Sequence, residues 1–256
     1  MTENLEDLSP RERRGSRARC ILLTNGSDKC VSERLTEIIA PWGQVDPEGD
    51  HWMPQGFSAP NETKLRPADD FLSQPQFEEL ADWWLSVKRG ANIPNWDIAS
   101  TAVVEGSSAR GLVLVEAKAH DKELTRGGKG PVTTANSARN HECIGGAIKE
   151  ANVGLESATG LPWGLSRDMD YQMSNRFAWA WKIAEMGTPV ILVYLGFLRA
   201  DEMEDQGEVF GTSEEWEDFV TSHTTVPADA WNPAKPWLIE GAPFVPIIRS
   251  QAVDLS

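Results

Sequence analysis

Hydrophobic residues recur along the chain with two periods, and the change from one period to the other marks the expected elements. Apolar residues three and four positions apart predict helices, whereas short, nearly continuous apolar runs predict buried strands. Ser73 precedes one helical run and is a favourable N-cap. The pattern predicts helices over 32–39, 73–90, 137–157, 170–186 and from Ser213 onward, and strands over 20–24, 96–105, 111–119, 190–198 and 237–250.

The order of these elements predicts an α/β protein with a mixed central sheet and helices on both faces. The run VILVYLGFL at 190–198 is apolar on both sides, as expected for a central strand that is covered twice. The chain has neither the glycine fingerprint of a dinucleotide-binding fold nor the Walker phosphate loop. We therefore expect no nucleotide cofactor.

The first 17 residues differ in composition from the rest of the chain. They combine acidic residues, Ser, Pro and several arginines with almost no apolar content, which is typical of a disordered arm. These arginines can contact nucleic acid, although a solvated tail is the simpler interpretation. Residues 18–256 are expected to form a single domain, because no internal repeat and no second boundary is visible. Within it, residues 41–70 predict a long loop.

Composition narrows the class of protein. Of 256 residues, 40% are hydrophobic and 25% are charged, as in ordinary globular domains. No apolar run approaches the roughly 20 residues that span a bilayer, and the first residues contain no hydrophobic signal segment. Cys20, Cys30 and Cys143 cannot all pair and have no close zinc-ligand partner, so we expect reduced thiols. These features predict a cytoplasmic protein without membrane contact.

The formal net charge of -15 bears on any nucleic-acid partner. Phosphate backbones attract clustered Lys and Arg, so an acidic chain binds DNA only where its positive charge is concentrated. Segments 64–90 and 118–149 hold many of these residues, whereas 201–218 is strongly acidic. The eleven tryptophans are expected mainly in the core, with a base-stacking platform as the alternative.

The strand predicted over 111–119 carries charged residues near its end. Because side chains alternate across a strand, Leu114, Glu116, Lys118 and His120 share one face. Burying either charge in a sheet is costly unless it is paired or metal-bound. One interpretation is a solvent-facing ion pair between Glu116 and Lys118. In the other, Glu116 binds a divalent cation and Lys118 contacts the negative charge that develops on a phosphoryl group.

Asp97 favours the second interpretation. It stands where a polar loop gives way to the strand predicted over 96–105, and the turn GSSARG leads into the next strand. An antiparallel hairpin of the two strands brings Asp97 and Glu116 to one open end of the sheet. Hard oxygen ligands of this kind suit Mg²⁺ or Mn²⁺, with water and substrate phosphate completing the coordination.

An acidic residue that opens one strand, followed by Glu-x-Lys at the end of the next, resembles the PD-(D/E)xK nuclease superfamily. The matching residues are Asp97, Glu116 and Lys118, while Pro94 stands three residues before the aspartate instead of immediately before it. The order of elements over 73–196 is similar to that family's αβββαβ core. The stretch from PNWDIAST to YQMSNRFAWAWK further resembles uncharacterised bacterial proteins assigned to this fold.

The resemblance implies a restriction-endonuclease-like fold with a mixed central sheet flanked by helices on both faces. It also implies metal-dependent hydrolysis of phosphodiester bonds in nucleic acid, without indicating which nucleic acid is the substrate. Asp97, Glu116 and Lys118 would be catalytic, and Asp97 and Glu116 would hold one or two Mg²⁺ (or Mn²⁺) ions. Such nucleases often take another acidic ligand from an upstream helix. Glu79 is chosen here for that metal ligand, with a solvated helix face as the alternative.

Several nucleases of this type also carry a Gln-containing polar motif on a helix after the lysine strand. Gln172 and Arg176 lie one turn apart on the helix predicted over 170–186, where they would bind phosphate or orient a metal ligand. His120 would contact the substrate from the end of the lysine strand. For all three residues, an ordinary polar role at the surface or at a strand end is the alternative.

Two other functions stay open. A catalytically inactive binding or scaffold protein that keeps the nuclease fold is favoured by the acidic net charge. A glycoside hydrolase would use Asp97 and Glu116 as its pair of carboxyl groups. We rank this last, because Lys118 beside the carboxylates suits a phosphate better than an uncharged glycan.

Overall fold

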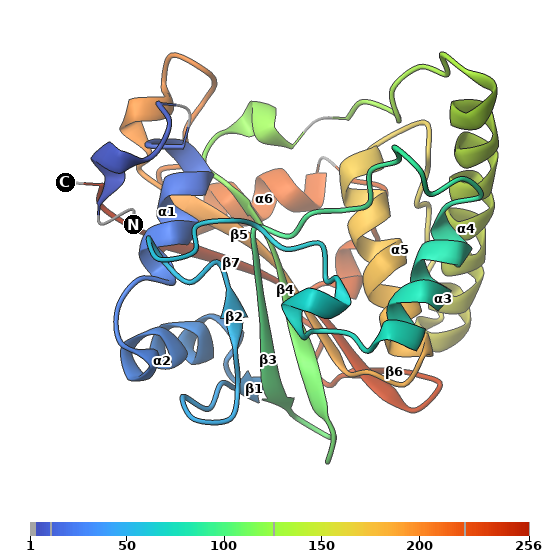
Figure 1. Ribbon diagram of the computed structural model, residues 1–256, viewed down its shortest axis with the longest axis horizontal. Helices are drawn as coiled ribbons and strands as arrows, with labels where there is room; N and C mark the ends of the chain where they lie inside the picture. The colour runs from blue at the N-terminus through green and yellow to red at the C-terminus, as the bar shows by residue number, and fades with distance from the viewer. Residues whose placement is uncertain (1–3, 11, 125, 223, 256) are drawn as a thin grey trace.

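A single mixed sheet forms the centre of the computed structural model, which describes residues 4–10, 12–124, 126–222 and 224–255 (Figure 1). Within these residues the strands are β1 (Gly43–Gln44), β2 (Trp52–Met53), β3 (Ile98–Val104), β4 (Arg110–Lys118), β5 (Val190–Leu198), β6 (Trp237–Ile239) and β7 (Ala242–Ala252). Their order is β1-β3-β4-β5-β7-β6, and β2 also pairs with β3. The pairs β4–β5 and β5–β7 are parallel, whereas β3–β4 and β6–β7 are antiparallel.

Helices cover both faces of this sheet, as the sequence pattern predicts (Figure 1). Two helices lie on one face and four on the other: α1 (Gly15–Leu23) and α2 (Asp28–Ile39), against α3 (Gln74–Trp84), α4 (Ala135–Thr159), α5 (Tyr171–Glu185) and α6 (Ser213–Ser222). Each layer of helices encloses its own hydrophobic core with one side of the strands. The protein is therefore a three-layer α/β structure.

Strand β4 contributes alternate residues to these two cores. Leu112 and Leu114 pack with the α3–α6 layer, whereas Val113 and Val115 pack with α1 and α2. The faces assigned from alternation are therefore correct. Strand β5 is buried along nearly its whole length, which confirms the prediction that it is central.

The strand predicted over 20–24 is wrong, because its apolar residues lie in helix α1. A short apolar run suits a buried strand or the packed side of a helix, and periodicity alone does not separate them. Helix α2 also begins earlier than predicted: Ser27 is its N-cap, and Ser32 is buried within it. The loop predicted over 41–70 contributes β1 and β2 to the sheet edge, because both pair with β3.

Of the arm predicted for the first 17 residues, positions 1–3 and 11 lie outside the described residues. In the described part, Leu8 is buried and α1 begins at Gly15. The Arg14 side chain pairs with the carboxylate of Asp205. These residues therefore pack on the domain, and one of the arginines expected in a solvated tail neutralises a carboxylate of the acidic segment.

The three cysteines carry free thiols. None of the helices in the described part of the chain combines the length and apolar character needed to cross a membrane.

Candidate active site

Asp97 and Glu116 lie opposite each other at one end of the β3–β4 hairpin. Ile98 pairs with Val115, so the next position along the antiparallel ladder joins Asp97 to Glu116. The Asp97 amide donates to the Val115 carbonyl at 3.1 Å, and the Ala117 amide donates to Asp97 Oδ2 at 2.7 Å. The juxtaposition of Asp97 and Glu116 that the sequence predicts is therefore present.

Glu116 is bound by three side chains. The Lys118 Nζ ammonium donates to Glu116 Oε1 at 2.5 Å, and Gln172 Nε2 donates to the same oxygen at 2.7 Å. Arg176 Nε donates to the other oxygen, Oε2, at 2.5 Å. Glu116 is 1% exposed and Lys118 is 5% exposed, so this network lies inside the protein. The solvent-facing ion pair considered from the sequence is therefore wrong.

Helix α5 brings Gln172 and Arg176 to the network. They are one helical turn apart and both point toward β4, because α5 packs along the sheet with a side that is buried from Met173 to Ala184. The Arg176 guanidinium also lies 5.1 Å from the centre of the Trp96 ring. A buried arginine held by a carboxylate and an aromatic face has little freedom to move. Arg176 therefore fixes the orientation of Glu116.

The charges in this network keep Glu116 and Lys118 ionised. Burial alone raises the pKa of Glu116, but the charges of Arg176 and Lys118 outweigh it and bring that pKa below its usual value. For Lys118, burial lowers the pKa, and the charges of Glu116 and Asp97 more than compensate, so its pKa is raised. Near neutral pH, a carboxylate and an ammonium group therefore face each other in a buried place.

Asp97 behaves differently. Burial, followed by repulsion from the Glu116 carboxylate, raises the pKa of Asp97 from 3.8 to about 7, and the charge of Lys118 offsets this only in part. Its Oδ1 atom accepts no hydrogen bond from the described residues. Near neutral pH, Asp97 is therefore divided between its acid and its anion, and a positive charge beside it would favour the anion.

This raised pKa predicts how stability depends on pH. Between pH 3.8 and about 7, the folded chain keeps a proton on Asp97 that the unfolded chain releases. The stability due to this proton is complete at the lower pH and is lost as the pH rises through 7. Thermal unfolding at pH 5 and pH 8 measures this effect. We expect the native chain to lose more stability between these two pH values than the Asp97→Asn variant does. The exposed Asp229→Asn serves as a control, and parallel curves for native chain and Asp97→Asn would contradict the assignment.

Asp97 and Glu116 supply part of what a divalent cation requires. Mg²⁺ is commonly bound through one or two carboxylates, with water and substrate phosphate at the other positions. Asp97 Oδ1 is available for this, and a Glu116 oxygen becomes available when Lys118 or Gln172 releases it. Among the described residues, no group of three or more His, Cys, Asp or Glu side chains is arranged to hold a metal ion. Asp97 and Glu116 are therefore the two side chains of this place that could hold a cation, and Glu116 could do so only in competition with its present partners.

Glu79 is not brought to these carboxylates. It lies on α3 with its side chain 59% exposed, 3.5 Å from the Lys182 ammonium. Helix α3 packs through Leu80 and Trp84, so Glu79 points away from the packed side. The expectation that Glu79 completes a three-carboxylate group with Asp97 and Glu116 does not agree with this arrangement.

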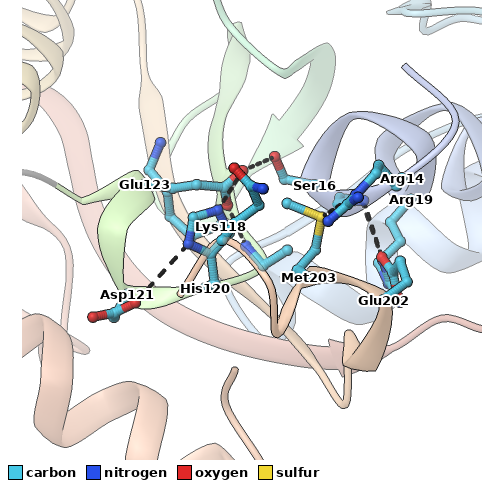
Figure 2. Close-up of polar contacts among 12 residues, drawn as sticks. Arg14, Ser16, Arg19, Lys118, His120, Asp121, Glu123, Glu202 and Met203 are labelled. Carbon is cyan, nitrogen blue, oxygen red and sulfur yellow. Dashed lines mark hydrogen bonds and ion pairs between the residues drawn. The ribbon is translucent and has the colours of Figure 1, made fainter. Parts of the chain in front are cut away.

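His120 lies beyond the end of β4, where its ring nitrogens face Asp121 and Glu123 (Figure 2). It is 7% exposed, and its Nε2 atom is 4.0 Å from Glu123 Oε1. Its Nδ1 atom is buried and has no hydrogen-bond partner among the described residues. His120 therefore belongs to a neighbouring polar group, and its contact with a substrate stays a prediction.

Sequence reasoning missed two acidic residues of this region. Glu123 lies in a short 3-10 turn after β4, accepts from the Ala119 amide at 2.5 Å and adds to the raised pKa of Lys118 (Figure 2). Glu62 comes from the loop after β2 and contributes to the raised pKa of Asp97. Neither position has a signal in the sequence, apart from the place of Glu123 five residues after the end of β4.

None of the protein-family models, curated proteins or solved structures that were compared with the chain matches it. The likeness to a nuclease family therefore depends on the site residues and on the order of the elements alone.

Proposed function

We propose that the protein is a metal-dependent phosphodiesterase that acts on nucleic acid and has a restriction-endonuclease-like fold. The observation that carries the proposal is the pair of carboxylates, Asp97 and Glu116, beside Lys118 at one end of the hairpin. Burial, followed by repulsion from Glu116, raises the pKa of Asp97 to about 7, and a cation bound between the carboxylates would relieve the repulsive part. An ammonium group next to such a pair suits a phosphate substrate.

The order of elements can be compared with the proposed fold. From α2 onward the elements are α2, β1, β2, α3, β3, β4, α4, α5 and β5, so the order αβββαβ is obtained only when the short edge strands β1 and β2 count as one strand and helices α3 and α4 count as additions. The candidate catalytic residues lie at the start of the second strand of this series and at the end of the third. Within 73–196, the range considered from the sequence, the order is α3, β3, β4, α4, α5, β5, so the described residues of that range have one strand fewer than αβββαβ requires and the match expected there is wrong.

In the proposed mechanism the residues of the candidate site have three different roles. Asp97 and Glu116 would hold a divalent cation, and such a cation would supply polarisation of the phosphate and activation of a water molecule. The Lys118 ammonium, kept charged by both carboxylates, stabilises the negative charge that develops on the phosphoryl group. Gln172 and Arg176 keep Glu116 oriented toward the site.

A direct test is incubation of the chain with single-stranded and double-stranded DNA and RNA, with Mn²⁺ or with EDTA. We expect shortened products with Mn²⁺ and intact nucleic acid with EDTA. Intact substrates in every Mn²⁺ sample, over a range of pH from 6 to about 9 that ionises Asp97, would argue against the function.

A second candidate is an inactive scaffold that keeps the fold. It is favoured by the occupation of both Glu116 oxygens and by the net charge of -15. Titration with Mn²⁺ by calorimetry separates the two. For a nuclease we expect saturable binding at pH 8 that Asp97→Asn removes and the exposed Asp229→Asn keeps. A scaffold with a permanently occupied Glu116 gives the same small heats for all three chains.

A further inference from the structure

A pocket of about 420 Å³ adjoins the candidate active site. One wall is α5, which presents Gln172 and Arg176, the two residues that bind Glu116. Another part of the lining is the segment 92–95, which ends two residues before Asp97. A ligand in this pocket therefore lies against the two side chains that bind Glu116 and against a segment close in sequence to Asp97.

The pocket is rich in amide groups. Asn92 and Asn95 come from one wall, and Gln172 and Asn175 from the other. The Oδ1 atom of Asn95 is buried and accepts no hydrogen bond from the described residues, although buried polar atoms usually have a partner. An amide side chain offers both donors and an acceptor, which match the mixed donors and acceptors on the edge of a nucleobase.

Aromatic and apolar surfaces lie beside these amides. Tyr171 contributes a half-buried ring, and Ile93 and Pro94 contribute an apolar surface, while Trp84 is 1% exposed and forms part of the packed floor. Unpaired bases bind proteins by stacking on such rings while their edges bond to polar side chains. The lining therefore combines both means of holding one base.

The charge of the pocket is opposite to that of the whole chain. Lys64 and Arg176 line it, and no carboxylate does so within the described residues. In the same part of the chain, Lys64 forms no ion pair. Arg176 is already paired with Glu116, so in a protein with a net charge of -15 it is Lys64 that offers a positive charge where a phosphate would accompany a bound base.

We propose that this pocket binds one unpaired nucleotide of a single-stranded nucleic acid, next to the phosphate that the active site cleaves. The proposal deepens the function above and rests on it for the position of the cleaved bond. The volume falls within the range of small-molecule sites and suits one nucleotide. Paired bases use their edges on each other, so a duplex must first release a base to enter.

The test is binding of a labelled 12-nucleotide single strand, and of the same sequence as a duplex, in EDTA at fixed salt. We expect the native chain to prefer the single strand. The double variant Lys64→Ala/Asn92→Ala should bind it about tenfold more weakly, because a phosphate and a base contact are lost. The matched control Lys235→Ala/Asn136→Ala changes exposed residues outside the pocket and should bind like the native chain.

A second pair of variants tests stacking on the pocket ring. Tyr171→Phe keeps the aromatic face and should bind the single strand normally, whereas Tyr171→Leu should weaken binding about tenfold. The proposed nucleotide site is contradicted if single strand and duplex bind with equal affinity, or if the Lys64→Ala/Asn92→Ala variant binds like the native chain.

The two proposals fail in different ways. If the single strand binds in a way that depends on the pocket but is not cleaved in Mn²⁺, the proposed nuclease function is contradicted and the nucleotide site is supported. If duplex and single strand are cleaved equally fast, and the pocket variants cleave like the native chain, the nuclease function is supported and the nucleotide site is contradicted.

Discussion

Replacing Lys118 by alanine is expected to lower Mn²⁺-dependent cleavage of nucleic acid about a thousandfold. The ammonium group is 5% exposed and is held beside Glu116 at the end of β4. Removing one group that stabilises charge in a transition state commonly lowers kcat by about 10²–10³-fold. The rate of product formation at saturating substrate measures the effect.

The Lys118→Ala variant should stay folded, because Glu116 keeps its bonds to Arg176 and Gln172. Circular dichroism and thermal unfolding check this. Lys122→Ala is the matched control, since it removes the same charge from an exposed position four residues further along the chain. If Lys118→Ala cuts as fast as this control, Lys118 has no part in the reaction and the assignment fails.

Replacing Glu116 by glutamine is expected to lower the free energy of unfolding by about 3 kcal/mol. The substitution keeps the shape of the side chain but removes the charge that Lys118 and Arg176 share. Both cations are then buried without a full counter-charge, and the partial charge of Asp97 does not replace it. Urea unfolding at pH 7 measures the loss.

Glu105→Gln is the control for this change, because Glu105 is exposed just after β3. Surface substitutions of this kind usually alter stability by less than about 0.5 kcal/mol. Equal unfolding midpoints for the two variants would mean that the Glu116 network contributes no net stability. In that case the bonds from Gln172 and Arg176 to Glu116 would have to be understood only in terms of function.

The network also has a consequence for cation binding. Lys118, Gln172 and Arg176 occupy both oxygens of Glu116, so a divalent cation has to compete with them. Asp97 has an oxygen without a protein donor and a pKa near the working pH. Cation binding should therefore become stronger as the pH rises through 7, because Asp97 then releases its proton.

Local patterns predicted the core of the site correctly. Alternation along β4 placed Leu114 and Glu116 on one face, and the hairpin of β3 and β4 brought Asp97 opposite Glu116. Both features depend on a few neighbouring residues and on a short turn, so no distant contact has to be known. The central position of β5 followed in the same way from its continuous apolar run.

Predictions failed where distant packing decides the outcome. The apolar run at 20–24 forms helix α1 because it packs against the sheet with α2, which the run itself does not encode. Glu79 was chosen from its place beside an apolar stripe, yet α3 packs against α4 and α5 with this carboxylate at the surface. A one-position rotation of a helix is enough to exchange a buried carboxylate for an exposed one.

Local sequence is enough to predict that Glu116 and Lys118 share a strand face and that Asp97 lies beside them at the open end of a hairpin. Side-chain alternation and a short turn suffice for that result. The resemblance leads us to expect Gln172 and Arg176 near a metal ligand, but their bonds to Glu116, more than fifty residues earlier, and the pocket beside them depend on how α5 packs against the sheet. Only the tertiary structure decided that Asp97 has a pKa of about 7, because burial and the distance between charges depend on how the layers pack.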